Sequence, residues 1–90
     1  MAIAIFGLGY VGTVTAACLA KEGHRVIGVD VATSKIDMIN AGLSPVIEGK
    51  IEDLTAEAVA SGHLVATNDI EFAIGSTDLC LVCVGTPSLP

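Results

Sequence analysis

The sequence is poor in positive charge and in aromatic side chains. Ten acidic residues stand against four cations, Lys21, Arg25, Lys35 and Lys50, and the formal charge is -6. Such a surface repels a nucleic-acid backbone, so the composition argues against a nucleic-acid partner. Aromatic residues make up only 3% of the chain, so the expected core consists of Ile, Val, Leu and Ala. Continuous aliphatic runs of this kind are typical of parallel strands that are buried on both faces.

Charged side chains are missing from the first twenty residues, and Lys21 is the first to appear. A secretory signal peptide needs a basic start, which Met1–Ala2–Ile3 does not provide. A membrane helix needs about twenty mainly apolar residues, whereas Gly7, Gly9 and Gly12 interrupt this stretch. We therefore predict no membrane partner and interpret the stretch as the beginning of a folded domain.

The cysteines, Cys18, Cys80 and Cys83, form an odd set without the spacing of a secreted disulfide framework. Cys80 and Cys83 match C-x-x-C, a pattern found in redox and zinc sites. Both lie in LCLVCV, which predicts a buried strand, and residues three apart on a strand point to opposite faces. We therefore expect three structural cysteines on core elements, no metal site, and reduced thiols in a cytoplasmic protein.

Short apolar runs alternate with segments of helical period, which is the pattern of βαβ units. The expected strands cover residues 2–6, 25–30, 64–66 and 79–84. The expected helices cover 11–22, a segment from a Thr33 or Ser34 cap to Gly42, 51–62, and a segment from an Asn68 or Asp69 cap to Ile74. The fold class is therefore α/β, with a partial Rossmann-like, doubly wound parallel sheet in the order 3-2-1-4.

A glycine-rich turn follows the first expected strand. Gly7-Leu8-Gly9-Tyr10-Val11-Gly12 fits G-x-G-x-x-G, with a strand before it and a helix after it. In this motif the first glycine makes the tight turn, the second admits a pyrophosphate, and the third lets the helix pack closely on the strand. The helix N-terminus then offers free N–H groups and a partial positive charge to the phosphates.

Asp30 ends the second expected strand, eighteen residues after Gly12. A carboxylate there can accept hydrogen bonds from the adenosine ribose, and it repels a 2′-phosphate. Two charges about 4 Å apart interact by roughly 4 kcal/mol at an effective dielectric constant of 20. Even part of that energy predicts NAD as the cofactor, with at least about tenfold preference over NADP.

Four segments resemble the N-terminal domain of the nucleotide-sugar 6-dehydrogenases, a family that includes UDP-glucose and GDP-mannose dehydrogenases. They are IFGLGYVG, VIGVDV with Lys35, SPVIE and VCVGTPS. The segment GVDVATSKIDMINAGLSPVIE is more similar in sequence to the GDP-mannose branch of the family than to the UDP-glucose branch.

The resemblance implies a cofactor site and a reaction. The implied NAD-binding residues are Gly7, Gly9, Tyr10, Val11, Gly12, Asp30, Lys35 and Thr86. The implied reaction oxidises a sugar C6 alcohol to a carboxylate with two NAD, in a homo-oligomeric enzyme of polysaccharide biosynthesis. The family's catalytic cysteine comes beyond position 90, and Cys18, Cys80 and Cys83 do not match it. We therefore expect the 90-residue chain alone to be inactive.

Two alternatives remain at this stage besides a UDP-glucose dehydrogenase. One is a non-catalytic Rossmann module, such as a nucleotide sensor. The other is a different Rossmann oxidoreductase, for instance a 3-hydroxyacid dehydrogenase, which the GTPS segment disfavours.

The last expected strand, Leu79–Val84, would be an edge in the order 3-2-1-4. It is apolar and contains neither lysine nor proline, the residues that commonly protect an edge strand from pairing with another chain. We predict that the chain self-associates there, by edge pairing or by exchange of a segment.

Overall fold

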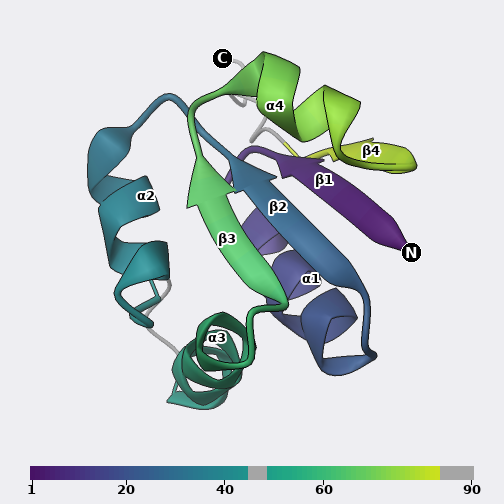
Figure 1. Cartoon of the computed structure of the whole chain (residues 1–90). Coiled ribbons are helices and arrows are strands. Elements are labelled where there is room, and N and C mark those ends of the chain that lie inside the picture. Colours follow the sequence, from purple (N-terminus) through teal and green to yellow (C-terminus); the bar gives the residue numbers. More distant parts are fainter. Residues whose placement is uncertain (45–48, 84–90) are drawn as a thin grey trace.

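A four-stranded parallel sheet organises the molecule (Figure 1). The computed structural model describes residues 1–44 and 49–83. The sheet order is β3-β2-β1-β4, which confirms the predicted topology. The strands are β1 (Ala2–Phe6), β2 (Arg25–Val29), β3 (Leu64–Thr67) and β4 (Leu79–Val82). The helices are α1 (Tyr10–Lys21), α2 (Thr33–Asn40), α3 (Gly49–Ala60) and α4 (Ile70–Gly75).

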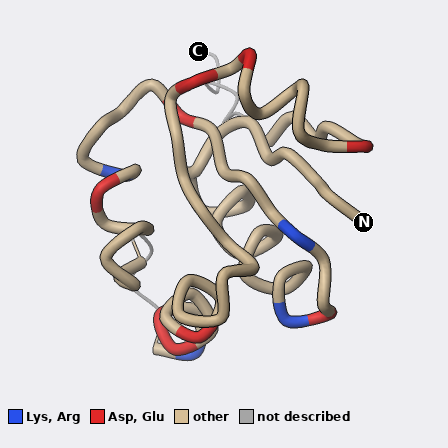
Figure 2. The backbone as a smooth tube through the Cα atoms, viewed as in Figure 1, with Lys and Arg blue, Asp and Glu red and all other residues tan. Residues whose placement is uncertain are grey.

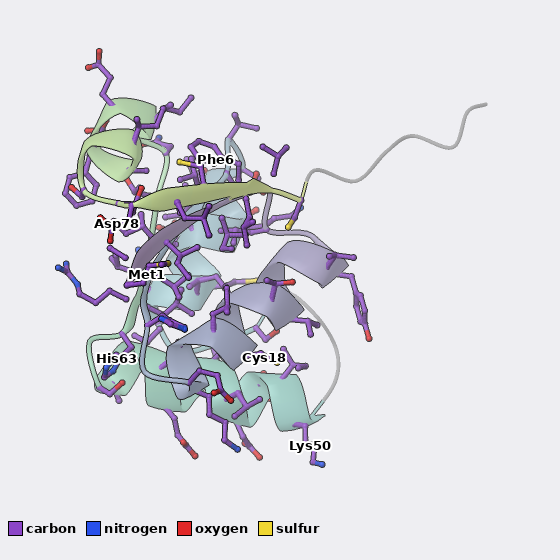
Figure 3. All side chains as sticks on the ribbon, turned by 90° about the vertical axis from the view of Figure 1, so that its right-hand side faces the viewer. Met1, Phe6, Cys18, Lys50, His63 and Asp78 are labelled. Atoms are coloured by element: carbon purple, nitrogen blue, oxygen red, sulfur yellow. The ribbon has the colours of Figure 1, made fainter. Side chains whose placement is uncertain are left out.

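Two apolar layers lie on the two faces of the sheet. Ile3 and Ile5 of β1 point to the face covered by α1, α2 and α3, where they pack with Ala16, Ile39 and other aliphatic side chains. The opposite face carries a smaller cluster of Ala4, Ile27, Val29 and Ala73, and α4 covers it. Figure 3 shows α4 on one side of the sheet and α1 and α3 on the other. This arrangement is that of a doubly wound fold, and it confirms the predicted fold class.

Helix boundaries agree with the predictions to within two residues, except at one cap. Gly23, Gly42 and Gly62 have positive φ values of 100°, 80° and 82° and lie where helices were expected to end. Asp69 caps α4, since its side chain accepts a hydrogen bond from Phe72 N at 3.0 Å. The predicted cap of α2 at Thr33 or Ser34 is wrong, because the N-cap is Ala32 and no side chain caps that helix.

The predicted burial of the cysteines is also wrong. Cys18 and Cys80 are exposed and Cys83 is half-buried, because β4 lies at an edge and the outer face of α1 has no covering layer. β4 ends at Val82, earlier than expected, and Val84 lies outside the described residues. All three thiols are free. Cys83 packs with Leu81 toward α1, whereas Cys80 pairs with Ala4 on the opposite face, so the C-x-x-C thiols diverge as expected.

The two edge strands of the sheet, β3 and β4, differ in how their outer backbone groups are paired. The side chain of Asn40 pairs with β3 as another strand would: its Nδ2 donates to Ala66 O at 2.9 Å and its Oδ1 accepts from Ala66 N at 2.8 Å. Among the described residues, nothing pairs with the outer edge of β4, where Leu79 is 44% and Val82 72% exposed. Figure 3 views the molecule from this open edge. Within residues 1–44 and 49–83, the β3 edge is therefore covered at Ala66, whereas the β4 edge is open.

Charge is distributed sparsely over the surface. Figure 2 shows the cationic positions scattered over separate elements. Acidic positions predominate on α3 and near α4. Within the described part of the chain, no helix has the length and apolar character needed to cross a bilayer.

The open β4 edge generates a prediction about assembly. We expect the chain to self-associate through β4. Val82→Lys should shift the equilibrium toward monomer, because a lysine buried between two paired edges loses its hydration and is repelled by the same lysine of the second copy. Val65→Lys is the matched control, since Val65 is also exposed (43%) but lies on the edge that Asn40 closes. Size-exclusion chromatography with light scattering over a concentration series measures the mass. A monomeric native chain at high concentration would contradict the prediction.

Candidate functional site

The glycine turn leaves the carboxyl end of β1 and leads directly into α1. Gly7 has a φ of 103°, a region that side chains disfavour, so a glycine is required there. Its N–H donates to the carbonyl of Val29 at 2.8 Å, which extends the pairing of β1 with β2 by one residue. The turn is therefore a continuation of the sheet rather than a free loop.

Gly12 and Gly9 are required for different reasons. A Cβ on Gly12 would lie 1.7 Å from the carbonyl oxygen of Gly7, so no side chain fits between α1 and the turn. A Cβ on Gly9 would meet nothing within 4 Å. The protein's own packing thus explains Gly12, whereas the space over Gly9 is open. In this motif, a pyrophosphate approaches the backbone at the position of Gly9.

The N-terminus of α1 has no side-chain cap among the described residues. Its first turn contains no acidic residue, and its N-cap is Gly9. The first N–H groups of a helix have no partner inside the helix, and they create a partial positive charge. Tyr10 and Val11 are 65% and 60% exposed, so this end of the helix faces solvent. It can receive an anion through backbone amides without a cationic side chain.

Asp30 lies beside the turn, directly after β2. Its Oδ2 accepts the N–H of Leu8 at 2.8 Å, and its Oδ1 accepts the N–H of Ala32 at 2.9 Å. Lys35 Nζ lies 4.0 Å from the same Oδ2. Burial raises the pKa of the Asp30 carboxyl, but the backbone hydrogen bonds from Ala32 and Leu8 and the Lys35 charge lower it by more, so it lies below its ordinary value of 3.8. Asp30 is therefore an ionised acceptor at neutral pH.

A pocket of about 170 Å³ opens beyond Asp30, at the carboxyl ends of β1 and β2 and the start of α4. Its walls are largely apolar, with Asp30 and Asn68 as the polar residues of the lining. The lining residues are Phe6, Gly7, Val29, Asp30, Val31, Asn68 and Ile70. In open α/β sheets, ligands bind at this edge, where the strand order reverses. Here β1 is the reversal point, with β2 on one side and β4 on the other.

Three residues that support the turn escaped the sequence analysis. Leu8 is completely buried, and its side chain occupies a notch over Gly28, where a Cβ would lie 2.8 Å from Leu8 Cδ2. Thr13, also buried, donates its hydroxyl to the Leu8 carbonyl at 3.1 Å. A glycine in the middle of an apolar strand is a signal of close approach, so Gly28 could have indicated that a neighbouring side chain needs its space.

The structure brings the predicted cofactor residues together, with one exception. Gly7, Gly9, Tyr10, Val11 and Gly12 form the turn and the first turn of α1, with Asp30 and then Lys35 beside them. Thr86 and residues 45–48 of the SPVIE segment lie outside the described residues. In the ranges 1–44 and 49–83, no group of three or more His, Cys, Asp or Glu side chains could hold a metal ion.

Residues 1–89 match the model of the UDP-glucose/GDP-mannose dehydrogenase family, NAD binding domain. The chain belongs to this family. Its assignment to the NAD-binding domain confirms the predicted cofactor, NAD.

Individual relatives agree with this assignment. Over 88 residues the chain is 52% identical to GDP-mannose 6-dehydrogenase of Pseudomonas syringae pv. syringae and 41% identical to UDP-glucose 6-dehydrogenase of Rhizobium meliloti, with 98% of the chain covered. A ternary complex of GDP-mannose dehydrogenase from Pseudomonas aeruginosa matches 99% of the chain, with a TM-score of 0.96 and 50% identity. The chain spans 20% of the length of each of these proteins.

The contrast between the two glycines generates a prediction. Gly12→Ala should destabilise the fold by at least about 2 kcal/mol, because the new methyl group overlaps the Gly7 carbonyl. Gly9→Ala, the matched control, should cost less than about 1 kcal/mol, since its methyl group meets only open space and the change is made at a helix N-cap. Urea unfolding of the ligand-free chain measures both. Equal losses of stability in the two variants would contradict the prediction that the close approach of α1 to the turn requires a glycine at position 12.

Proposed function

We propose that this chain is the NAD-binding module of a nucleotide-sugar 6-dehydrogenase. The observation that carries the proposal is the joint placement of the glycine turn, the uncapped N-terminus of α1 and the Asp30 carboxylate at one edge of the sheet. When bound, NAD supplies a nicotinamide that accepts a hydride from the substrate. The residues of this chain bind and orient the cofactor.

Each part of the proposed site suits one part of the cofactor. The amides at the N-terminus of α1, from Tyr10 onward, would hold the pyrophosphate over the open space at Gly9. Asp30 and Lys35 would bind the ribose hydroxyls, the carboxylate as acceptor and the ammonium group as donor. The adenine ring would occupy the pocket lined by Val31, Asn68 and Ile70. Thr86, the remaining predicted contact, belongs to the same proposal.

The charge at the ribose position supports NAD rather than NADP. Asp30 is ionised, and its side chain is only 11% exposed, so solvent screens it weakly. A 2′-phosphate next to it would meet direct repulsion. Lys35 moderates this effect, but it is 39% exposed and already lies close to Asp30.

We further propose GDP-mannose as the substrate of the whole enzyme, with oxidation to GDP-mannuronate by two NAD. The support is the higher identity to the GDP-mannose enzymes, 52% against 41% for the UDP-glucose enzyme of Rhizobium meliloti. UDP-glucose is the second candidate, since the family model covers both activities. A homo-oligomeric state, a cytoplasmic location and a role in polysaccharide biosynthesis belong to the same proposal.

Cofactor selectivity tests the proposed site. Isothermal titration calorimetry should give tighter binding of NAD than of NADP by about tenfold or more. Asp30→Ala should remove most of this preference. Lys35→Met should weaken the binding of both cofactors by about fivefold, the effect of one lost hydrogen bond. Lys21→Met is the matched control, because Lys21 ends α1 at the opposite end of the helix from the site. Equal native affinities for NAD and NADP would contradict the role of Asp30.

A graft tests the assignment to the GDP-mannose branch. The chain would replace the aligned 88 residues of the Pseudomonas aeruginosa GDP-mannose enzyme and, in parallel, of the Rhizobium meliloti UDP-glucose enzyme. We expect the GDP-mannose graft to retain the larger fraction of its parent's kcat, because its interfaces with the rest of the enzyme are better matched. The same graft with Asp30→Ala should show a raised KM for NAD. Greater retention in the UDP-glucose recipient would contradict the substrate proposal.

A further inference from the structure

We propose that Asp30 positions the glycine turn as well as the ribose, through its hydrogen bond to the backbone amide of Leu8. The inference rests on the proposed function and deepens it, because it makes the affinity for the pyrophosphate depend on a side chain that does not touch the pyrophosphate. The bond spans 22 positions of the sequence and joins the end of β2 to the turn.

The carboxylate is held between two backbone segments before any ligand binds. Oδ2 accepts from the turn, at Leu8 N (2.8 Å), and Oδ1 accepts from the start of α2, at Ala32 N (2.9 Å). A carboxylate has about four acceptor positions, and the N–H groups of Leu8, Ala32 and Val31 use up to three of them, so at least one remains for a ribose hydroxyl. The ribose and the turn therefore share one acceptor group.

Leu8 is held in place from two further directions. Its buried side chain fills the notch over Gly28, and its carbonyl accepts the hydroxyl of Thr13 at 3.1 Å. These contacts fix the peptide so that its N–H points at Asp30. The amides left for the phosphates are those of the following residues, at the N-terminus of α1. The orientation of that helix start thus depends on the Leu8 anchor.

The proposal and the simpler alternative predict opposite changes. If Asp30 only contacted the ribose, its removal would reduce the repulsion of a diphosphate, and the phosphates would contribute more to binding. If Asp30 positions the turn, its removal releases Leu8, and the phosphates contribute less. The ratio of the adenosine Kd to the ADP Kd measures this phosphate contribution, because both ligands contain the same ribose.

Calorimetry with adenosine and with ADP provides the test. In Asp30→Ala, we expect the ratio of the two Kd values to fall about five- to tenfold, the effect of losing one charge-assisted hydrogen bond. Asp30→Asn is a partial control: it removes the charge and keeps one acceptor oxygen, which can accept from either Leu8 N or Ala32 N, so the ratio should fall less than in Asp30→Ala. A ratio that is unchanged or higher in Asp30→Ala would overturn the proposal.

A second variant disturbs Leu8 without touching Asp30. The methyl group of Gly28→Ala would lie 2.8 Å from Leu8 Cδ2 and must displace this side chain. We expect ADP binding to weaken about fivefold while adenosine binding changes less than about twofold. Gly49→Ala, whose methyl group would meet nothing within 4 Å, is the matched glycine control. An unchanged ratio in Gly28→Ala would overturn the positioning role.

Amide hydrogen exchange of the ligand-free chain separates this proposal from the proposed function. In Asp30→Ala the Leu8 amide should exchange about tenfold faster. The Gly7 amide, which donates to Val29 O instead, should be unchanged and reports that the fold is intact. If the native chain binds neither adenosine nor ADP, this result contradicts the proposed function alone. Equal exchange of Leu8 in the native chain and in Asp30→Ala would overturn the positioning role, whatever the binding result.

Discussion

The close approach of α1 to the end of β1 is the constraint on which the rest of the site depends. It exists because residue 12 has no side chain, since a Cβ there would overlap the Gly7 carbonyl oxygen at 1.7 Å. With the helix in this position, its first amides lie at the carboxyl edge of the sheet, beside the end of β2. Asp30 can then reach Leu8, and the pocket beyond it acquires the turn as one wall.

An acidic protein can offer an anion site because the attraction comes from the backbone. The first turn of α1 contains no cation, and the chain as a whole carries a formal charge of -6. Helix-terminal amides supply fixed partial charges that need no counter-charge on the surface. The ammonium group of Lys35 lies 4.0 Å from Asp30, so the proposal places it on the ribose side. In the proposed site, a carboxylate would receive the hydroxyls and backbone amides would receive the phosphates.

The sequence predicted the helices and strands wherever the signal was local, and it named the glycine turn and Asp30, which the structure brings together. Apolar runs located the strands, and the glycines of positive φ at positions 23, 42 and 62 located the helix ends. Periodicity reports how apolar a segment is and does not report whether another layer covers it, so the burial of Cys80 was predicted wrongly. The capping of α2 was misjudged for a different reason. The N-cap is Ala32, and its N–H donates to Asp30 two residues earlier, a local turn contact that the prediction overlooked.

Two supports of the turn were missed because they join segments that are distant in the chain. Leu8 rests over Gly28, and Asp30 reaches back to the Leu8 amide. The glycine motif indicates which positions must lack a side chain. These contacts instead determine how rigidly the backbone of the turn is held. Such contacts follow from the pairing of β1 with β2, which brings residue 5 beside residue 28.

Asn40 has a consequence for the size of any assembly that the sheet can form. A sheet with two open edges can add copies at both ends and grow into a fibre, because each addition leaves a new edge exposed. Here the amide of Asn40 occupies both backbone groups of Ala66 and closes one edge with a single side chain. If copies pair through β4, as we predict, the Asn40 contact at Ala66 would hinder a second pairing at β3. One asparagine would then favour a dimer over a polymer.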